Sequence, residues 1–263
     1  MIDRVTESAS VTKLARSSSF PLVAGHSEFP HMQNNASSVL VSKKKLANGK
    51  YLYIGLTNKH VTNQLPNTNI VHYDKNGLPT QTKVNIEKEH RDFGDRDLVM
   101  FSFTSDNPNL GVVEIADENS KVDKVITVGF PSSQTPSHPY LDNRDVSYGN
   151  SPLGPPVIEA EVNIREREID PEANNTWFRR FTRWVGDTYY FNDVLDVSGV
   201  PVYSGQSGSG LINEDGELIG IMALGTYKPD DGNPETKEGV AIDLREISKG
   251  LNSDIEKINN RYM

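Results

Sequence analysis

A serine set among glycines is the feature of this sequence best suited to chemistry. It lies in the run Tyr203-Ser204-Gly205-Gln206-Ser207-Gly208-Ser209-Gly210, between two apolar stretches. Such a run can be a flexible linker, but an apolar segment with a tight Glu214-Asp215-Gly216 turn follows at once. We therefore favour a nucleophile turn. In it, glycines let the backbone N–H groups of Gly205 and Ser207 point into one concavity and hold an oxyanion.

A serine nucleophile needs a base and a group that orients the base. All the histidines precede Ser207: His26, His31, His60, His72, His90 and His138. This order excludes the α/β-hydrolase arrangement, in which the histidine follows the serine, and leaves the order His, Asp, Ser. His60 directly follows a predicted strand over 51–57, so it is the predicted base. The other five are interpreted as solvated or packing side chains.

The acid that orients this base is predicted to be Asp97. An apolar strand, predicted over 98–103, begins immediately after it. Asp92 and Asp95 are the alternatives, and we interpret them as solvated loop charges. The three candidates lie far apart in the chain, so a fold must bring them together.

Short strands separated by turns are predicted from Ser37 onward, which is typical of an all-β sandwich or barrel. Two β-rich runs flank Asn48-Gly49, a strong hairpin signal. The proline-rich segment 131–156 divides an earlier strand series from a later one that includes 157–165, 183–191 and 218–224. Apolar residues at helical spacing predict a terminal helix: Leu244, Ile247, Leu251, Ile255 and Ile258. The predicted units are an N-terminal arm (1–35), two β-rich halves (36–135 and 136–243, with inserted loops) and a helix (244–263).

Composition excludes several classes of protein. The chain has 263 residues, 36 acidic and 27 basic, for a net charge of −9. This argues against nucleic acid or an anionic membrane as the main partner, so the basic aromatic stretch 177–184 is interpreted as packing rather than binding. The absence of cysteine excludes thiolate metal sites and a cysteine nucleophile. No apolar run approaches the ~18 residues of a membrane span, and no signal peptide is evident, so we expect a cytoplasmic protein.

The three chemical elements together resemble the trypsin-like serine peptidases. Residues 56–61 resemble the family's L-T-x-x-H-V signature, 97–100 its D-[LI]-A-[LV] pattern with Val99 for alanine, and 205–209 its G-x-S-G-x run. Segments 57–61, 207–209, 218–221 and 239–242 are similar to the bacterial glutamyl endopeptidase branch. The chain departs from the common nucleophile run where Gln206 replaces aspartate and Gly210 replaces proline.

The resemblance implies an all-β, chymotrypsin-like fold of two antiparallel six-stranded barrels with a C-terminal α-helix. It implies that His60, Asp97 and Ser207 form a catalytic triad in the cleft between the barrels, with Gly205 and Ser207 as the oxyanion hole. The activity would be hydrolysis of peptide bonds through an acyl-enzyme. No metal or organic cofactor is expected.

The resemblance also places a substrate pocket on both sides of the nucleophile. Its implied residues are Pro201, Tyr203, Ser204, Met222, Ala223, Leu224 and Gly225. No acid stands at Pro201, which argues against Arg or Lys at P1, and no histidine stands at Met222, which argues against Glu. We expect a small or apolar P1 residue in a protein or peptide substrate.

Other hypotheses stay open from the sequence. The chain could be a catalytically silent protease fold used as a binding module, an esterase, or a zymogen activated by a regulatory partner or by cleavage near Leu22-Val23-Ala24-Gly25. All three triad residues are present, which favours the enzyme.

Overall fold

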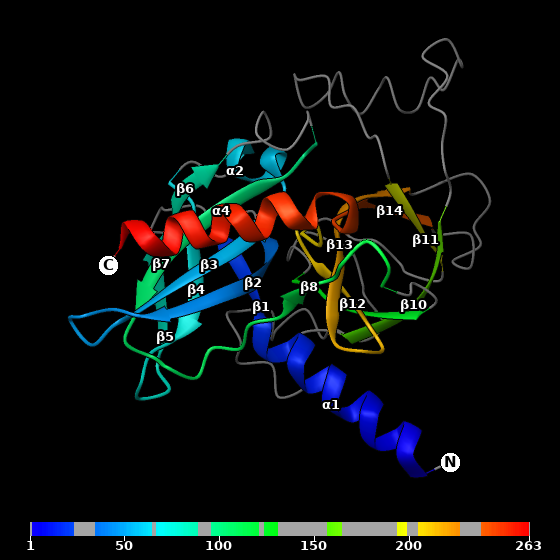
Figure 1. Ribbon diagram of the computed structural model, residues 1–263, viewed down its shortest axis with the longest axis horizontal. Helices are drawn as coiled ribbons and strands as arrows, with labels where there is room; N and C mark the ends of the chain where they lie inside the picture. The colour runs from blue at the N-terminus through cyan, green and yellow to red at the C-terminus, as the bar shows by residue number, and fades with distance from the viewer. Residues whose placement is uncertain are drawn as a thin grey trace.

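Two antiparallel β-barrels form the body of the protein (Figure 1). The computed structural model describes residues 2–23, 35–64, 67–88, 96–120, 124–130, 157–164, 194–198, 205–226 and 238–262. The first sheet has the strand order β5-β4-β1-β2-β3-β7-β6. Its strands are β1 (Ser19–Val23), β2 (Asn35–Lys45), β3 (Tyr51–Thr57), β4 (Asn69–Tyr73), β5 (Pro79–Lys83), β6 (Asn85–Lys88) and β7 (Val99–Ser105).

The first sheet closes through a bent strand. Val84 alone separates β5 from β6, so the two are halves of one strand. The first half pairs with β4 and the second with β7. This sharing joins the two ends of the sheet, and the described strands make a six-stranded barrel.

The second sheet closes by direct pairing of β12 with β13. Six antiparallel strands make the ring in the order β12-β9-β10-β11-β14-β13, and the short β8 adds to β13 in parallel. These strands are β8 (Glu114–Ile115), β9 (Lys124–Val128), β10 (Val157–Ile164), β11 (Val194–Ser198), β12 (Gly210–Asn213), β13 (Glu217–Thr226) and β14 (Glu238–Asp243). The all-β fold of two six-stranded barrels is confirmed.

Alternation along the strands explains how the core is divided. On β3, Tyr53 points into the first barrel with Phe101 and Phe103, while Leu52 and Ile54 point out of it. The outward apolar side chains of both barrels form one large cluster, and the interior of the second barrel forms another. A strand buried on both faces needs apolar residues at nearly every position, and β3 is buried at six of its seven.

Two helices cover the cluster between the barrels. The predicted terminal helix is confirmed as the short η4 (Arg245–Ile247) and α4 (Ser248–Arg261), with Leu251, Ile255 and Ile258 buried. It leaves β14 and crosses to the first barrel (Figure 1), where Lys44 Nζ donates to the Asn259 carbonyl at 3.0 Å. The other helix, α1 (Ile2–Ser18), buries Val11 and Ala15 in the same cluster, and its first turns project from the body.

Both predicted barrel boundaries require correction. The arm predicted over 1–35 contains α1 and also β1, which pairs with β2 and β4 and so belongs to the first barrel. The second barrel begins with β9, before residue 136, because β9 pairs with β10 and β12. β9 therefore belongs to the second barrel, although it precedes the proline-rich segment 131–156 that the sequence indicates as the boundary. The strand predicted over 183–191 lies outside the described residues, and β11 falls where no strand was predicted.

Candidate active site

A buried histidine–aspartate pair lies where β3 ends and β7 begins. His60 stands in the first turn of α2 (Lys59–Gln64), which follows β3 after a single residue. One residue separates Asp97 from the start of β7. β7 pairs with β3 so that Val99 lies opposite Thr57. The antiparallel pairing therefore brings the two candidates together from 37 positions apart.

The Asp97 carboxylate contacts both the backbone and the ring of His60. Oδ1 accepts the His60 backbone N–H at 2.9 Å, and Oδ2 lies 2.5 Å from the ring Nδ1. The main-chain carbonyl of Asp97 accepts the Asn58 side-chain amide at 2.9 Å. His60 and Asp97 are 5% and 1% exposed, so this pair is largely screened from bulk water.

The candidate nucleophile lies on a tight loop that joins the second barrel. Gly205 and Gly208 have φ values of +96° and +90°, a region that favours glycine. The Gln206 carbonyl accepts both the backbone N–H of Ser209, at 3.0 Å, and its hydroxyl, at 2.6 Å. Ser207 itself is partly exposed, and its Oγ donates to the Ala223 carbonyl at 3.2 Å.

The loop presents two unused backbone donors. Among the described residues, the N–H groups of Gly205 and Ser207 have no hydrogen-bond acceptor. In a trans peptide the N–H points opposite to the preceding carbonyl. The Gln206 carbonyl is held inside the turn by Ser209, so the Ser207 N–H points out of it. Such an arrangement can bind an anionic oxygen.

The loop is fastened to β13 next to the implied substrate pocket. Gly208 N–H donates to the Met222 carbonyl and Met222 N–H donates to the Ser209 carbonyl, both at 2.8 Å. The β13–β14 register shifts between Met222 and Leu224, which leaves Ala223 unpaired with β14 and its carbonyl at the Ser207 hydroxyl.

The other implied pocket residues fall into two groups. The Met222 side chain packs in the interior of the second barrel, among Leu195, Val197 and Ile219. Leu224 and Gly225 continue β13. Pro201, Tyr203 and Ser204 lie outside the described residues, as do Asp92 and Asp95.

One contact of this loop is not evident from the sequence. Ser37, fully buried on β2, bonds to the carbonyls of both Gly205 and Ser207. No local pattern marks Ser37, because its partner Gly205 lies 168 positions away in the chain.

The chain matches a known family over most of its length. Residues 36–221 match the family described as a trypsin-like peptidase domain. The chain belongs to the trypsin-like peptidases. Family membership and the two-barrel fold together support a serine endopeptidase.

Solved structures with the trypsin-like fold support the same architecture at low sequence identity. The HtrA-type protease AlgW with a tripeptide is 19% identical, with a TM-score of 0.56 over 95% of this chain and 64% of AlgW. Deg5 is 14% identical, with a TM-score of 0.56 over 93% of this chain and 91% of Deg5. A serine endoprotease from Yersinia pestis is 20% identical, with a TM-score of 0.53 over 94% and 66%. The chain thus spans less than two thirds of AlgW. No curated protein matches it.

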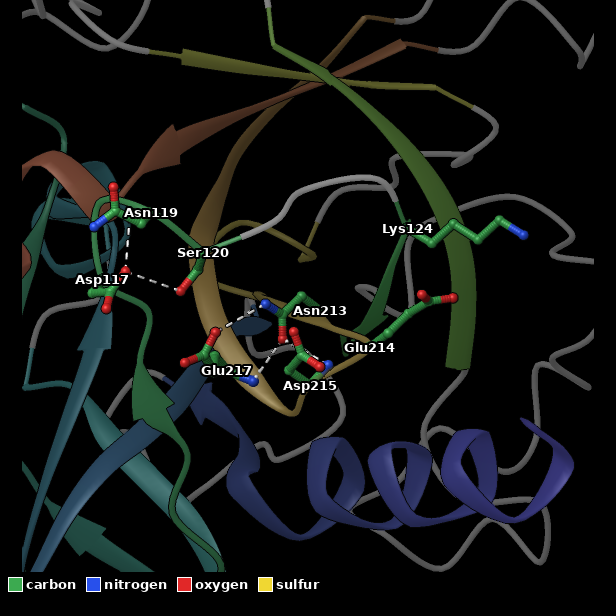
Figure 2. A pocket seen from close by; sticks show the side chains of 8 residues that line it. All are labelled: Asp117, Asn119, Ser120, Lys124, Asn213, Glu214, Asp215 and Glu217. Atoms are coloured by element: carbon green, nitrogen blue, oxygen red, sulfur yellow. Dashed lines mark hydrogen bonds between the residues drawn. The ribbon is translucent and has the colours of Figure 1, made fainter. Parts of the chain in front are cut away.

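A separate acidic hollow lies at the far end of the β12–β13 hairpin from the nucleophile loop. Its cavity of about 470 Å³ is lined by Asp117, Asn119, Ser120, Lys124, Asn213, Glu214, Asp215 and Glu217 (Figure 2). Asn213 Oδ1 accepts the backbone N–H groups of Asp215 and Glu217, so its amide organises the turn. The described segments contain no group of three or more His, Asp or Glu side chains placed to hold a metal ion. Their helices include none long and apolar enough to cross a membrane.

Proposed function

We propose that this trypsin-like peptidase hydrolyses peptide bonds with Ser207 as nucleophile, His60 as general base and Asp97 as the group that orients the base. The observation that carries the proposal is the pair of hydrogen bonds between the Asp97 carboxylate and His60. One joins Oδ1 to the His60 backbone N–H at 2.9 Å, and the other joins Oδ2 to the ring Nδ1 at 2.5 Å. A carboxylate only accepts, so the Nδ1 facing it must carry the proton. The lone pair of the neutral ring is then on Nε2, which is the atom a base must use.

Ser207 has to turn its hydroxyl before it can react. In this structure the proton is directed at the Ala223 carbonyl, 3.2 Å from Oγ. Rotation about χ1 between staggered wells redirects Oγ at little cost, so we expect the hydroxyl to leave Ala223 for the Nε2 of His60 when a substrate enters. Oγ then attacks the scissile carbonyl, and His60 passes the proton it takes to the leaving amine.

The proposed oxyanion hole consists of the N–H groups of Gly205 and Ser207. Support comes from their lack of acceptors among the described residues and from the turn that fixes the Ser207 N–H. Removing one such donor lowers kcat by about 10²–10³-fold in a measured case.

We propose an extended peptide as substrate, lying along β13. Beyond Met222, β13 pairs with β14 on one side, and no described strand pairs with it on the other. A strand edge of this kind accepts an extended peptide through backbone hydrogen bonds. The released Ala223 carbonyl would become one of the acceptors. The tripeptide in the AlgW structure supports a peptide as the ligand class.

A small or apolar P1 residue is the specificity we propose. Met222 supplies no charge, and its side chain is 1% exposed in an apolar core, so it offers no partner for a charged P1 group. The finer resemblance to the glutamyl endopeptidase branch and the regulatory partner stay predictions. Cleavage of a peptide library mainly after Glu, Arg or Lys would overturn the P1 proposal.

Intact-mass detection of fluorophosphonate labelling tests the triad. We expect one adduct on the wild type and none on Ser207→Ala or His60→Ala. Ser209, two residues further along the chain, is no alternative nucleophile, because its hydroxyl is buried and bonded to the Gln206 carbonyl. A folded wild type that stays unlabelled would refute an assembled site and favour the silent binding module.

A further inference from the structure

Ser37 uses every polar atom it has at the junction of the two barrels. Its backbone N–H donates to the Ser207 carbonyl at 2.9 Å, and its backbone carbonyl accepts the Thr57 hydroxyl at 2.8 Å. Its Oγ donates to the Gly205 carbonyl at 2.8 Å and accepts the Phe130 N–H at 2.9 Å. The side chain is fully buried. One residue of the first barrel thus contacts the nucleophile loop, the strand before His60 and the segment just after β9.

The position of Ser37 on β2 explains why its backbone N–H and carbonyl are available for contacts outside the strand pairing of the sheet. On one side it lies opposite Pro21 of β1, and its backbone N–H and C=O both point away from that strand, to the Ser207 carbonyl and the Thr57 hydroxyl. On the other side β3 has ended at Thr57, so the β2 edge has lost its neighbour. The nucleophile loop takes that place. It approaches so closely that a Cβ on Gly208 would meet the Ser37 carbonyl oxygen at 1.9 Å.

The direction of the hydroxyl bond is fixed by chemistry. A hydroxyl has one proton and two acceptor sites. Phe130 N–H can only donate, so the Ser37 proton must go to the Gly205 carbonyl. The two carbonyls that Ser37 binds belong to Gly205 and Ser207, the same residues whose N–H groups form the proposed oxyanion hole.

We propose, on the basis of the proposed function, that Ser37 is the positioning residue of the oxyanion hole. Its hydroxyl holds Gly205 in the conformation that presents the two N–H groups. Gly205 has no side chain to limit φ and ψ, and its φ of +96° is one of many it can adopt. Anchoring its carbonyl fixes the peptide between Gly205 and Gln206, so the preceding peptide, which carries the Gly205 N–H, can turn only about φ and ψ of Gly205. The bond from Ser37 N–H to the Ser207 carbonyl holds the other side of the loop.

Ser38 provides a matched control one residue away. It is also fully buried on β2, and its Oγ also donates to a backbone carbonyl, that of Phe20 at 3.0 Å. That carbonyl belongs to β1 and has no part in the nucleophile loop. Ser38→Ala therefore deletes one buried hydroxyl bond and Ser37→Ala deletes two, and only Ser37 supports Gly205.

The experiment compares kcat, KM and melting temperature for the wild type, Ser37→Ala, Ser37→Cys and Ser38→Ala. We expect Ser37→Ala to lower kcat about 10–100-fold with KM within about threefold, since a misplaced donor costs less than the 10²–10³ of a lost one. The rate of fluorophosphonate labelling should fall in parallel. Ser38→Ala should lower the melting temperature by a smaller amount, because it deletes one buried hydroxyl bond rather than two. It should leave kcat within about twofold, because Ser38 does not contact the nucleophile loop.

Ser37→Cys keeps nearly the same side-chain volume but has a weaker hydrogen-bond donor. It replaces Ser37→Ala in the comparison if the alanine variant does not fold. We expect its kcat to lie between those of the wild type and Ser37→Ala. Equal kcat in Ser37→Ala and Ser38→Ala, or an unchanged kcat in Ser37→Cys, would overturn the inference. An unlabelled, inactive wild type would instead refute the proposed function itself, so the two failures are distinguishable.

Discussion

Replacing Asp97 by asparagine exchanges one carboxylate oxygen for an NH2 group and tests the proposed base directly. The backbone N–H of His60 needs an acceptor 2.9 Å away, which only the Asn oxygen can supply. The amide nitrogen is then forced to face the ring Nδ1, which lies 2.5 Å from Oδ2 in the wild type. An amide N–H donates, so Nδ1 becomes the acceptor and the ring proton moves to Nε2. The base would then lack a lone pair facing Ser207.

The size of the effect follows from the lost charge and the wrong tautomer. A carboxylate and an imidazolium about 4 Å apart attract by about 4 kcal/mol at an effective dielectric constant near 20. That is close to 10³-fold in rate at 1.36 kcal/mol per tenfold. The wrong tautomer adds at least about another tenfold, which gives about 10⁴-fold in kcat, as found for the corresponding change in a well-studied triad. Asp97 is 1% exposed, so solvent does not weaken the interaction.

The assay is single-turnover fluorophosphonate labelling beside hydrolysis of an unfolded protein substrate. Asp106→Asn is the control, because that carboxylate belongs to the same barrel and is 41% exposed; it should behave as the wild type. Circular dichroism must show that Asp97→Asn is folded. A folded Asp97→Asn that retained a tenth of the wild-type kcat would show that Asp97 does not orient the base.

Three further predictions concern the frame around the site. Gly208→Ala should abolish labelling, because φ of Gly208 is +90° and a Cβ there would meet a backbone oxygen of β2 at 1.9 Å. As a control, Gly250→Ala on α4 has open space around its Cβ. It should raise stability by up to about 1 kcal/mol in urea titrations. Burial lowers the pKa of His72 from its ordinary 6.5. The contribution of His72 to the free energy of unfolding should therefore be constant above pH 6.5 and fall below it, because the unfolded chain gains a proton that the buried ring resists. A His72→Gln variant that kept the wild-type pH slope between pH 5 and 8 would contradict this. Leu251→Ala should cost about 2–5 kcal/mol of stability in denaturant titrations, because this helix side chain is fully buried between the barrels, and a loss under 1 kcal/mol would mean that α4 adds little to the core.

The sequence by itself determined the features that depend on neighbouring residues. The spacing of Leu251, Ile255 and Ile258 predicted the terminal helix, and Asn48-Gly49 predicted the β2–β3 hairpin, because helical periodicity and turn geometry are local properties. The candidates His60 and Asp97 were found at strand ends for the same reason. Their pairing was implied only by the family resemblance, and the antiparallel pairing of β3 with β7 brings them into contact.

Only the tertiary structure decided which strands belong to which barrel and what holds the nucleophile loop. β1 follows a helix that the sequence did not indicate, and β9 precedes the proline-rich segment 131–156, yet each pairs with strands distant in the chain. Strand pairing is set by long-range contacts, which leave no mark in a short window of sequence. Ser37 shows this most clearly. Nothing distinguishes it from Ser38 along the chain, and closure of two barrels places one against Gly205 and the other against β1.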